Sequence, residues 1–169
     1  MSLLSAVAVG TTALVSRHIG QGDRRGAALA TRLSLGLAAA TGTVVAAVLM
    51  VADGALLERM FPAVEPAVLV EAERYLAVAL VALPIALVEA VAAAALQASG
   101  DTRTPLVAAS VANVVNLVVS AALIFGVGPI PALGVTGAAI GSAIAFTLQA
   151  LLLWRCLFTH LTLPTIYSV

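Results

Sequence analysis

The sequence predicts an all-α integral membrane protein, folded as an antiparallel bundle of transmembrane helices. Hydrophobic residues make up 62% of the 169 residues, charged residues only 9%, and the mean hydropathy is +1.14. A soluble domain usually carries about 25% charged residues, and a globule of this size cannot bury so large an apolar fraction. The apolar residues also form long, continuous runs, whereas a membrane β-barrel shows alternating segments of about ten residues.

The charge balance excludes several function classes. Eight arginines and eight acids give a formal net charge of zero, so no basic surface is available for nucleic acid. Disorder would need low hydrophobicity and high charge. The single cysteine, Cys156, has no disulfide partner and no companion ligand for a metal. The chain also lacks the Gly-x-Ser-x-Gly and His-Glu-x-x-His motifs of hydrolases, so we expect no enzyme activity, no cofactor and no metal site.

Five apolar stretches are expected to form the helices. The first is uncharged but shorter than the roughly 20 residues that a span needs, so we expect only part of a helix there. The last two belong to one uncharged run that glycines and prolines between Gly126 and Gly134 break into a helical hairpin. The approximate spans are 1–16 (partial), 33–52, 75–98, 105–127 and 133–154, within one membrane domain over residues 1–169 that ends in a C-terminal tail, 155–169.

Arginine placement predicts the orientation. Cytoplasmic loops of membrane proteins carry an excess of Lys and Arg. With the C-terminus cytoplasmic, six of the eight arginines lie inside, and the outer loop holds Arg59, Arg74 and five acids. We therefore expect a multi-pass protein of the plasma (inner) membrane, with segment 60–74 at the outer interface. The short, uncapped first stretch also suggests a fragment of a longer protein. The six inner arginines are Arg17, Arg24, Arg25, Arg32, Arg103 and Arg155.

Two loops on the expected cytoplasmic side carry a Gly-Asp step. One reads SRHIGQGDRR from Ser16, and the other reads QASGDTRTP from Gln97. Glycine permits the left-handed turn that leaves a helix, Asp or Thr can cap the next helix, and proline suits its first turn. These roles explain both loops structurally, and His18 is expected to be merely solvated. The loop motif residues are Gly20, Gly22, Asp23, Gly100, Asp101, Thr102, Arg103 and Pro105.

These loop motifs, followed by Asn113-x-x-Asn116 with Phe125-Gly126 and by the stretch from Leu133 to Ile140, resemble the multidrug and toxic compound extrusion (MATE) family in their order and spacing. The resemblance covers almost the whole chain and implies part of helix two and helices three to six of an N-terminal lobe. It implies a secondary antiporter that exports amphipathic or cationic compounds in exchange for H⁺ or Na⁺. The implied partners are the bilayer, the small-molecule substrate and a missing second lobe or a second copy, and no nucleic acid.

A polar stripe runs along the fourth expected span. Ser110, Asn113, Asn116 and Ser120 fall within about 120° of arc on a helix, so this face should meet protein or water. Interhelical hydrogen bonding and a cation or proton site both explain it. The resemblance implies that Asn116 and Ser142 contribute to a cation site and that Ser120 stands where many members carry Asp. Serine cannot relay a proton as Asp would.

Glu89 is the only acid deep within an expected span. An isolated carboxylate at mid-membrane costs about 2.5–3.5 kcal/mol or more, so the group should be neutral or paired. We interpret Glu89 either as a proton-binding or cationic-substrate-binding group, or as a hydrogen-bonded structural acid. Gly137 and Gly141 form a Gly-x-x-x-Gly step that predicts close helix packing. The alternative functions are a lipid-linked oligosaccharide flippase of the same superfamily and a small structural membrane protein that does not transport.

Overall fold

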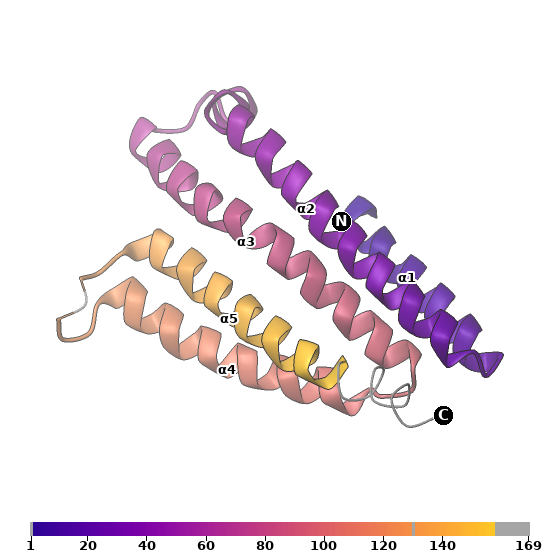
Figure 1. Ribbon diagram of the computed structural model, residues 1–169. Coiled ribbons are helices and arrows are strands. Elements are labelled where there is room, and N and C mark those ends of the chain that lie inside the picture. The colour runs from indigo at the N-terminus through magenta and orange to yellow at the C-terminus, as the bar shows by residue number, and fades with distance from the viewer. Residues whose placement is uncertain (1, 130, 158–169) are drawn as a thin grey trace.

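The computed structural model describes residues 2–129 and 131–157 and is built from five α-helices (Figure 1). The part of the chain that the structure describes contains no strand, so the all-α prediction is confirmed. Residues 24–52 of the second helix and the whole of the next three are long and apolar enough to cross a membrane. The helices are α1 (Ser2–Gly20), α2 (Arg24–Met60), α3 (Pro66–Ala98), α4 (Arg103–Phe125) and α5 (Gly134–Leu157).

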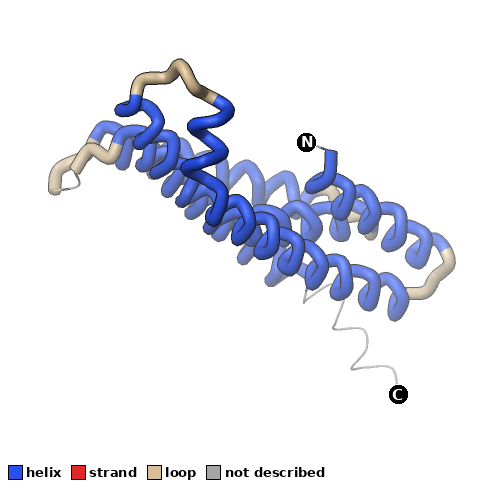
Figure 2. Tube along the Cα trace, turned by 90° about the horizontal axis from the view of Figure 1, so that it is seen from above, coloured by secondary structure: helices blue, strands red, loops and turns tan. Residues whose placement is uncertain are grey.

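The helices run antiparallel, so their connections gather at two ends of the bundle. The turns of residues 21–23 and 99–102 lie at one end, here called the turn end, and residues 61–65 and 126–129 lie at the other, the loop end. Four helices form a row in the order α2, α3, α5, α4, and α1 packs against α2 and α3. Figure 2 shows the α1–α2 turn as a short tan loop. In this row α5 separates α3 from α4.

The helices extend beyond several of the apolar ranges expected from the sequence. With 37 and 33 residues, α2 and α3 are about 55 and 50 Å long, more than the roughly 30 Å of a bilayer core. Their additional turns carry charged side chains that are exposed or half-buried, so the helix continues after the apolar run stops. Residues 66–74 belong to α3. There the Arg74 guanidinium donates a hydrogen bond to the Glu71 carboxylate, with 2.9 Å between Nη1 and Oε1.

The remaining boundaries differ in the same way. The first helix reaches Gly20, and α4 and α5 span Arg103–Phe125 and Gly134–Leu157, slightly displaced from 105–127 and 133–154. Arg155, Cys156 and Leu157 are helical, so the expected tail of residues 155–169 begins inside α5. Residues 158–169 of that tail lie outside the described residues.

A core at the turn end holds all five helices together. Apolar side chains elsewhere on the helices are widely exposed: Val51 is 92% and Leu117 72% exposed. Contiguous apolar surface of this extent suits lipid and not water. The buried core residues are Val15, Ala27, Ala92, Ala95, Leu96, Ala108, Leu153 and Leu157.

Candidate functional site

The turn between α1 and α2 ends one helix and starts the next within three residues. Gly22 has a φ of +73°. Its N–H donates to the carbonyl oxygen of Ile19 (3.0 Å), and the N–H of Asp23 donates to the carbonyl oxygen of His18 (2.9 Å). This pair of bonds is the Schellman motif, which satisfies the last carbonyl groups of a helix. Asp23 then caps α2, because its Oδ1 accepts the N–H of Gly26 at 2.8 Å.

The turn between α3 and α4 repeats this pattern bond for bond. Gly100 has a φ of +96°. Its N–H donates to the carbonyl oxygen of Gln97 (3.1 Å), and the N–H of Asp101 donates to the carbonyl oxygen of Leu96 (3.0 Å). The Asp101 Oδ1 accepts the N–H of Thr104 at 3.0 Å. Each Gly-Asp step therefore supplies a left-handed residue that ends one helix and a carboxylate that caps the next.

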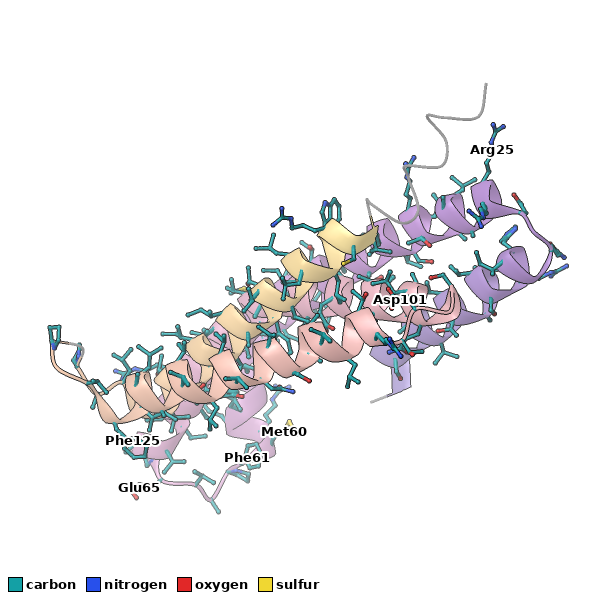
Figure 3. All side chains as sticks on the ribbon, turned by 90° about the horizontal axis from the view of Figure 1, so that it is seen from below. Arg25, Met60, Phe61, Glu65, Asp101 and Phe125 are labelled. Carbon is teal, nitrogen blue, oxygen red and sulfur yellow. The ribbon has the colours of Figure 1, made fainter. Side chains whose placement is uncertain are left out.

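The other motif residues of these turns lie at the helix ends. Gly20 is the last residue of α1 and is exposed. Thr102 stands at the N-cap position of α4 but makes no side-chain cap bond, so the cap comes from Asp101. Arg103 is the exposed first residue of α4, and Pro105 is buried in its first turn. Figure 3 shows Asp101 and Arg25 toward the same end of the molecule.

His18 pairs with the capping carboxylate of the first turn. The His18 Nδ1 and the Asp23 Oδ2 lie 3.0 Å apart, with 33% and 48% of the two side chains exposed. The expectation that His18 is merely solvated is therefore wrong. The N–H of Gly26 holds the pKa of Asp23 below its ordinary value of 3.8, and His18 adds to this effect.

Glu89 lies half-buried on α3 and bonds to a helix far along the chain. Its Oε1 accepts a hydrogen bond from the Nε2 of Gln149 on α5 at 2.6 Å. Another part of α3 is packed against α2. A methyl group added to Gly42 of α2 would lie 2.7 Å from the Cα of Pro84 of α3, so the two backbones are in close contact. Glu89 is therefore carried by a helix that is packed on both sides.

The polar stripe of α4 is divided between exposed and half-buried positions. Ser110 and Asn113 are exposed, and the Ser110 hydroxyl donates a hydrogen bond to the carbonyl oxygen of Leu106 (2.9 Å) in the same helix. Asn116 and Ser120 are half-buried, and the Ser120 hydroxyl donates to the Asn116 Oδ1 at 2.7 Å. Only the half-buried pair, and not the whole stripe, is partly covered by the rest of the protein.

Glycines of α5 bring that helix close to Ser120. A methyl group at Gly137 would lie 2.7 Å from the Leu123 carbonyl carbon, and one at Gly141 would collide with the Ser120 hydroxyl and come within 3.0 Å of its Cα. The predicted Gly-x-x-x-Gly packing is therefore confirmed. Ser142 follows Gly141 directly and is half-buried, so it lies at the level of Ser120 on the neighbouring helix.

The structure thus divides the candidate residues into two groups. On α4, Asn116 and Ser120 bond to each other and Ser120 lies against Gly141 of α5, whereas Glu89 pairs with Gln149 where α5 meets α3. Gln149 was not predicted as a site residue, although a lone amide within an apolar helix needs a hydrogen-bond partner. Gln149 lies seven residues after Ser142, so the two share one face of α5.

Long apolar helices that hold polar groups between them indicate a multi-pass membrane protein. The chain belongs to the MatE family, whose model matches residues 1–122. The family consists of membrane transporters and not of enzymes. The structure of this chain is similar to that of an inward-facing multidrug resistance MATE family transporter of the MOP superfamily. The TM-score is 0.83 and the identity 26%, and the match covers 92% of this chain and 34% of that chain.

Two curated proteins are also similar in sequence. A probable multidrug resistance protein NorM of Thermotoga maritima is 32% identical over 143 residues, which are 85% of this chain and 30% of that protein. A FAD transporter of Shewanella oneidensis is 45% identical over 47 residues, 28% of this chain and 10% of that protein. The chain spans about a third or less of the length of these relatives.

Proposed function

We propose that this chain forms part of a secondary active antiporter that exports drugs or other amphipathic organic compounds in exchange for H⁺ or Na⁺. The observation that carries the proposal is the alignment of 92% of the chain with an inward-facing multidrug transporter. The Thermotoga protein, also named for multidrug resistance, supports the same activity. In this proposal the remaining part of the transporter is a second lobe or a second copy of the chain.

The proposed orientation places the turn end in the cytoplasm and the loop end outside, in the plasma membrane. Arg17, Arg24, Arg25, Arg103 and Arg155 lie at or near the turn end, in agreement with the excess of arginine expected inside. The partners in this setting are the bilayer and a cationic or amphipathic small molecule, and the mechanism uses no cofactor and no nucleic acid.

Two groups of side chains are proposed for the exchange. Asn116 and Ser120 of α4 and Ser142 of α5 offer neutral oxygens. They would hold a cation only weakly, because hard cations bind best where carboxylates are present. Glu89 offers the carboxyl group in the spans and is proposed to bind a proton or the cationic substrate. Ser110 and Asn113 lie on the exposed face of α4 and are proposed to line the pathway with them.

Dye transport in sealed vesicles tests this function. The native-length protein is reconstituted, a proton or sodium gradient is imposed, and the movement of ethidium, a cationic amphipathic dye, is followed by fluorescence. We expect one of the gradients to drive the dye and Asn116→Ala or Ser142→Ala to slow it. Thr43→Ala is the matched control, because Thr43 is exposed and bonds only its own helix at Ala39. Folded protein that moves no dye under either gradient would contradict the proposal.

A further inference from the structure

The bond between Glu89 and Gln149 joins two helices that are 60 residues apart in sequence. On α3, Leu87 and Val91 pack against Ala38 of α2. Glu89 lies about 160° around the helix from both of them, at 100° per residue. Its carboxyl is therefore directed away from α2, and the hydrogen bond shows that it meets α5.

An amide partner differs from a charged one because it fits both protonation states of a half-buried acid. The NH₂ group of glutamine donates to a carboxylate, and its carbonyl oxygen accepts from a carboxylic acid. An arginine in the same place would hold the group ionised. Gln149 can therefore keep the Glu89 carboxyl in one position while a proton binds and leaves.

The charged groups of the neighbouring helices lie toward the ends of the bundle. On α3 itself, Arg74 is fifteen residues from Glu89, about 22 Å along the axis. On α5, Arg155 is six residues from Gln149, about 9 Å along the axis. Among the side chains that the structure describes, the charged and titratable groups on the helices around α3 are Arg17 and His18 of α1, Arg24, Arg25, Arg32, Glu58 and Arg59 of α2, Arg103 of α4, and Arg155 and Cys156 of α5. Beside Arg74, α3 itself carries Glu71, Glu73 and Tyr75 near its start.

We infer that Glu89 and Gln149 form a proton-binding site between α3 and α5, in which Gln149 is the positioning residue that holds the Glu89 carboxyl. Loading adds one proton to a carboxylate oxygen, and release returns it to water. The site is separate from Asn116 and Ser120 of α4, because α5 lies between α3 and α4. The inference rests on the proposed antiport function. It adds that the ion bound at Glu89 is a proton and that Gln149 is part of the site.

Carbodiimide labelling tests the site without requiring transport. Dicyclohexylcarbodiimide reacts with protonated carboxyl groups in apolar surroundings, and the labelled peptide is identified by mass spectrometry. The native-length protein in lipid vesicles is labelled over a series of pH values. We expect Glu89 to be labelled, the label to fall as the pH rises, and Glu89→Gln to abolish it. A protein in which Glu89 takes no label at any pH overturns the inference.

The role of Gln149 is tested by the pH profile of the same reaction. Gln149→Leu removes the hydrogen bond to both forms of the carboxyl, and the bond to the charged form is the stronger one, so we expect the midpoint of labelling to move to higher pH by about one unit. Thr147→Val is the matched control on α5, because Thr147 is exposed and bonds only Ala143. An unchanged midpoint in Gln149→Leu would mean that Gln149 does not hold the carboxyl.

Two further measurements keep the test decisive. If Gln149→Leu fails to fold, Glu89→Asp replaces it, because the shorter side chain withdraws the carboxyl from Gln149 and should give the same displaced midpoint. If Glu89→Asp had the same midpoint of labelling as the wild type, the inference would also be overturned. Dye transport separates the two proposals: a Gln149-dependent labelling profile in a protein that moves no dye would support the proton site and contradict the exporter.

Discussion

Asp23 and Asp101 make the same two hydrogen bonds at successive turns of one end of the bundle. Each donates its N–H to the carbonyl five residues before it and accepts, through Oδ1, the N–H three residues after it. In each turn the preceding glycine adopts a positive φ. The two turns that the proposed orientation places in the cytoplasm are thus copies of one short structural motif, although their flanking residues differ.

The caps predict a matched pair of stability effects. Asp101→Ala should cost about 1 kcal/mol of stability, the usual price of a lost N-cap, whereas Asp101→Asn should cost less because its amide oxygen still accepts the Thr104 N–H. Thr102→Ala is the control, since Thr102 makes no side-chain cap bond. Thermal unfolding in detergent, followed by circular dichroism, measures all three. Equal losses in Asp101→Ala and Thr102→Ala would contradict the assignment of the cap to Asp101.

The lowered pKa of Asp23 predicts a pH dependence with a definite sign. Because the pKa of the folded state lies below 3.8, the carboxylate stabilises the fold fully above that value and loses its contribution as the pH falls through the folded pKa. The difference in melting temperature between the wild type and Asp23→Asn should therefore shrink as the pH is lowered below 3.8.

Glu65→Gln serves as the comparison for this titration. Glu65 is exposed at the loop end and makes no side-chain cap bond to α3. Its substitution should leave the melting temperature nearly unchanged over the same pH range. If the gap between the wild type and Asp23→Asn stayed constant into acid, folding would not lower the pKa of Asp23.

The contact between Gly141 and Ser120 predicts an overpacking effect. Gly141→Ala should destabilise the protein by about 1–3 kcal/mol, because the added methyl group has Ser120 on one side and no room to move away. Gly36→Ala is the matched control: its methyl group would have no neighbour within 4 Å, and alanine favours the helix by up to about 1 kcal/mol. Denaturation midpoints in detergent compare the two. The idea fails if Gly141→Ala is as stable as Gly36→Ala.

Opposite ends of the molecule should be labelled from opposite sides of the membrane. Figure 3 places Arg25 at one end and Glu65 at the other. With Cys156 replaced by serine, single cysteines at these two positions are treated with a membrane-impermeant maleimide. We expect Glu65→Cys to react in intact cells and Arg25→Cys to react only in inverted vesicles. The reverse pattern would show that the turn end lies outside.

Local chemistry in the sequence predicted much of the fold. The uncharged runs predicted the helices, and the Gly-Asp steps predicted both turns, since positive-φ glycine and a capping carboxylate act within six residues. The helix ends were harder to predict. Arg24 and Arg59 lie outside the apolar run of α2, yet the helix includes both, because arginine is a good helix former and a charged side chain does not interrupt a helix.

Contacts between distant residues could not be read from the sequence. Glu89 stood out as a single acid in an apolar run, but its partner depends on α5 packing beside α3, which no local pattern reveals. The stripe on α4 was predicted as one face, yet only Asn116 and Ser120 of it are half-buried, and Ser120 lies against Gly141 of α5. The pattern gave the direction of each side chain on its own helix, and the order of the helices determined what it meets.

The order of the helices in the row also determines which movements leave the packing intact. The hairpin of α4 and α5 meets the other helices mainly through α3. A sliding of this hairpin as one rigid piece would therefore preserve the contacts among α1, α2 and α3 and disturb mainly the boundary between α3 and α5. Glu89 and Gln149 lie on that boundary, so their hydrogen bond would register such a displacement directly.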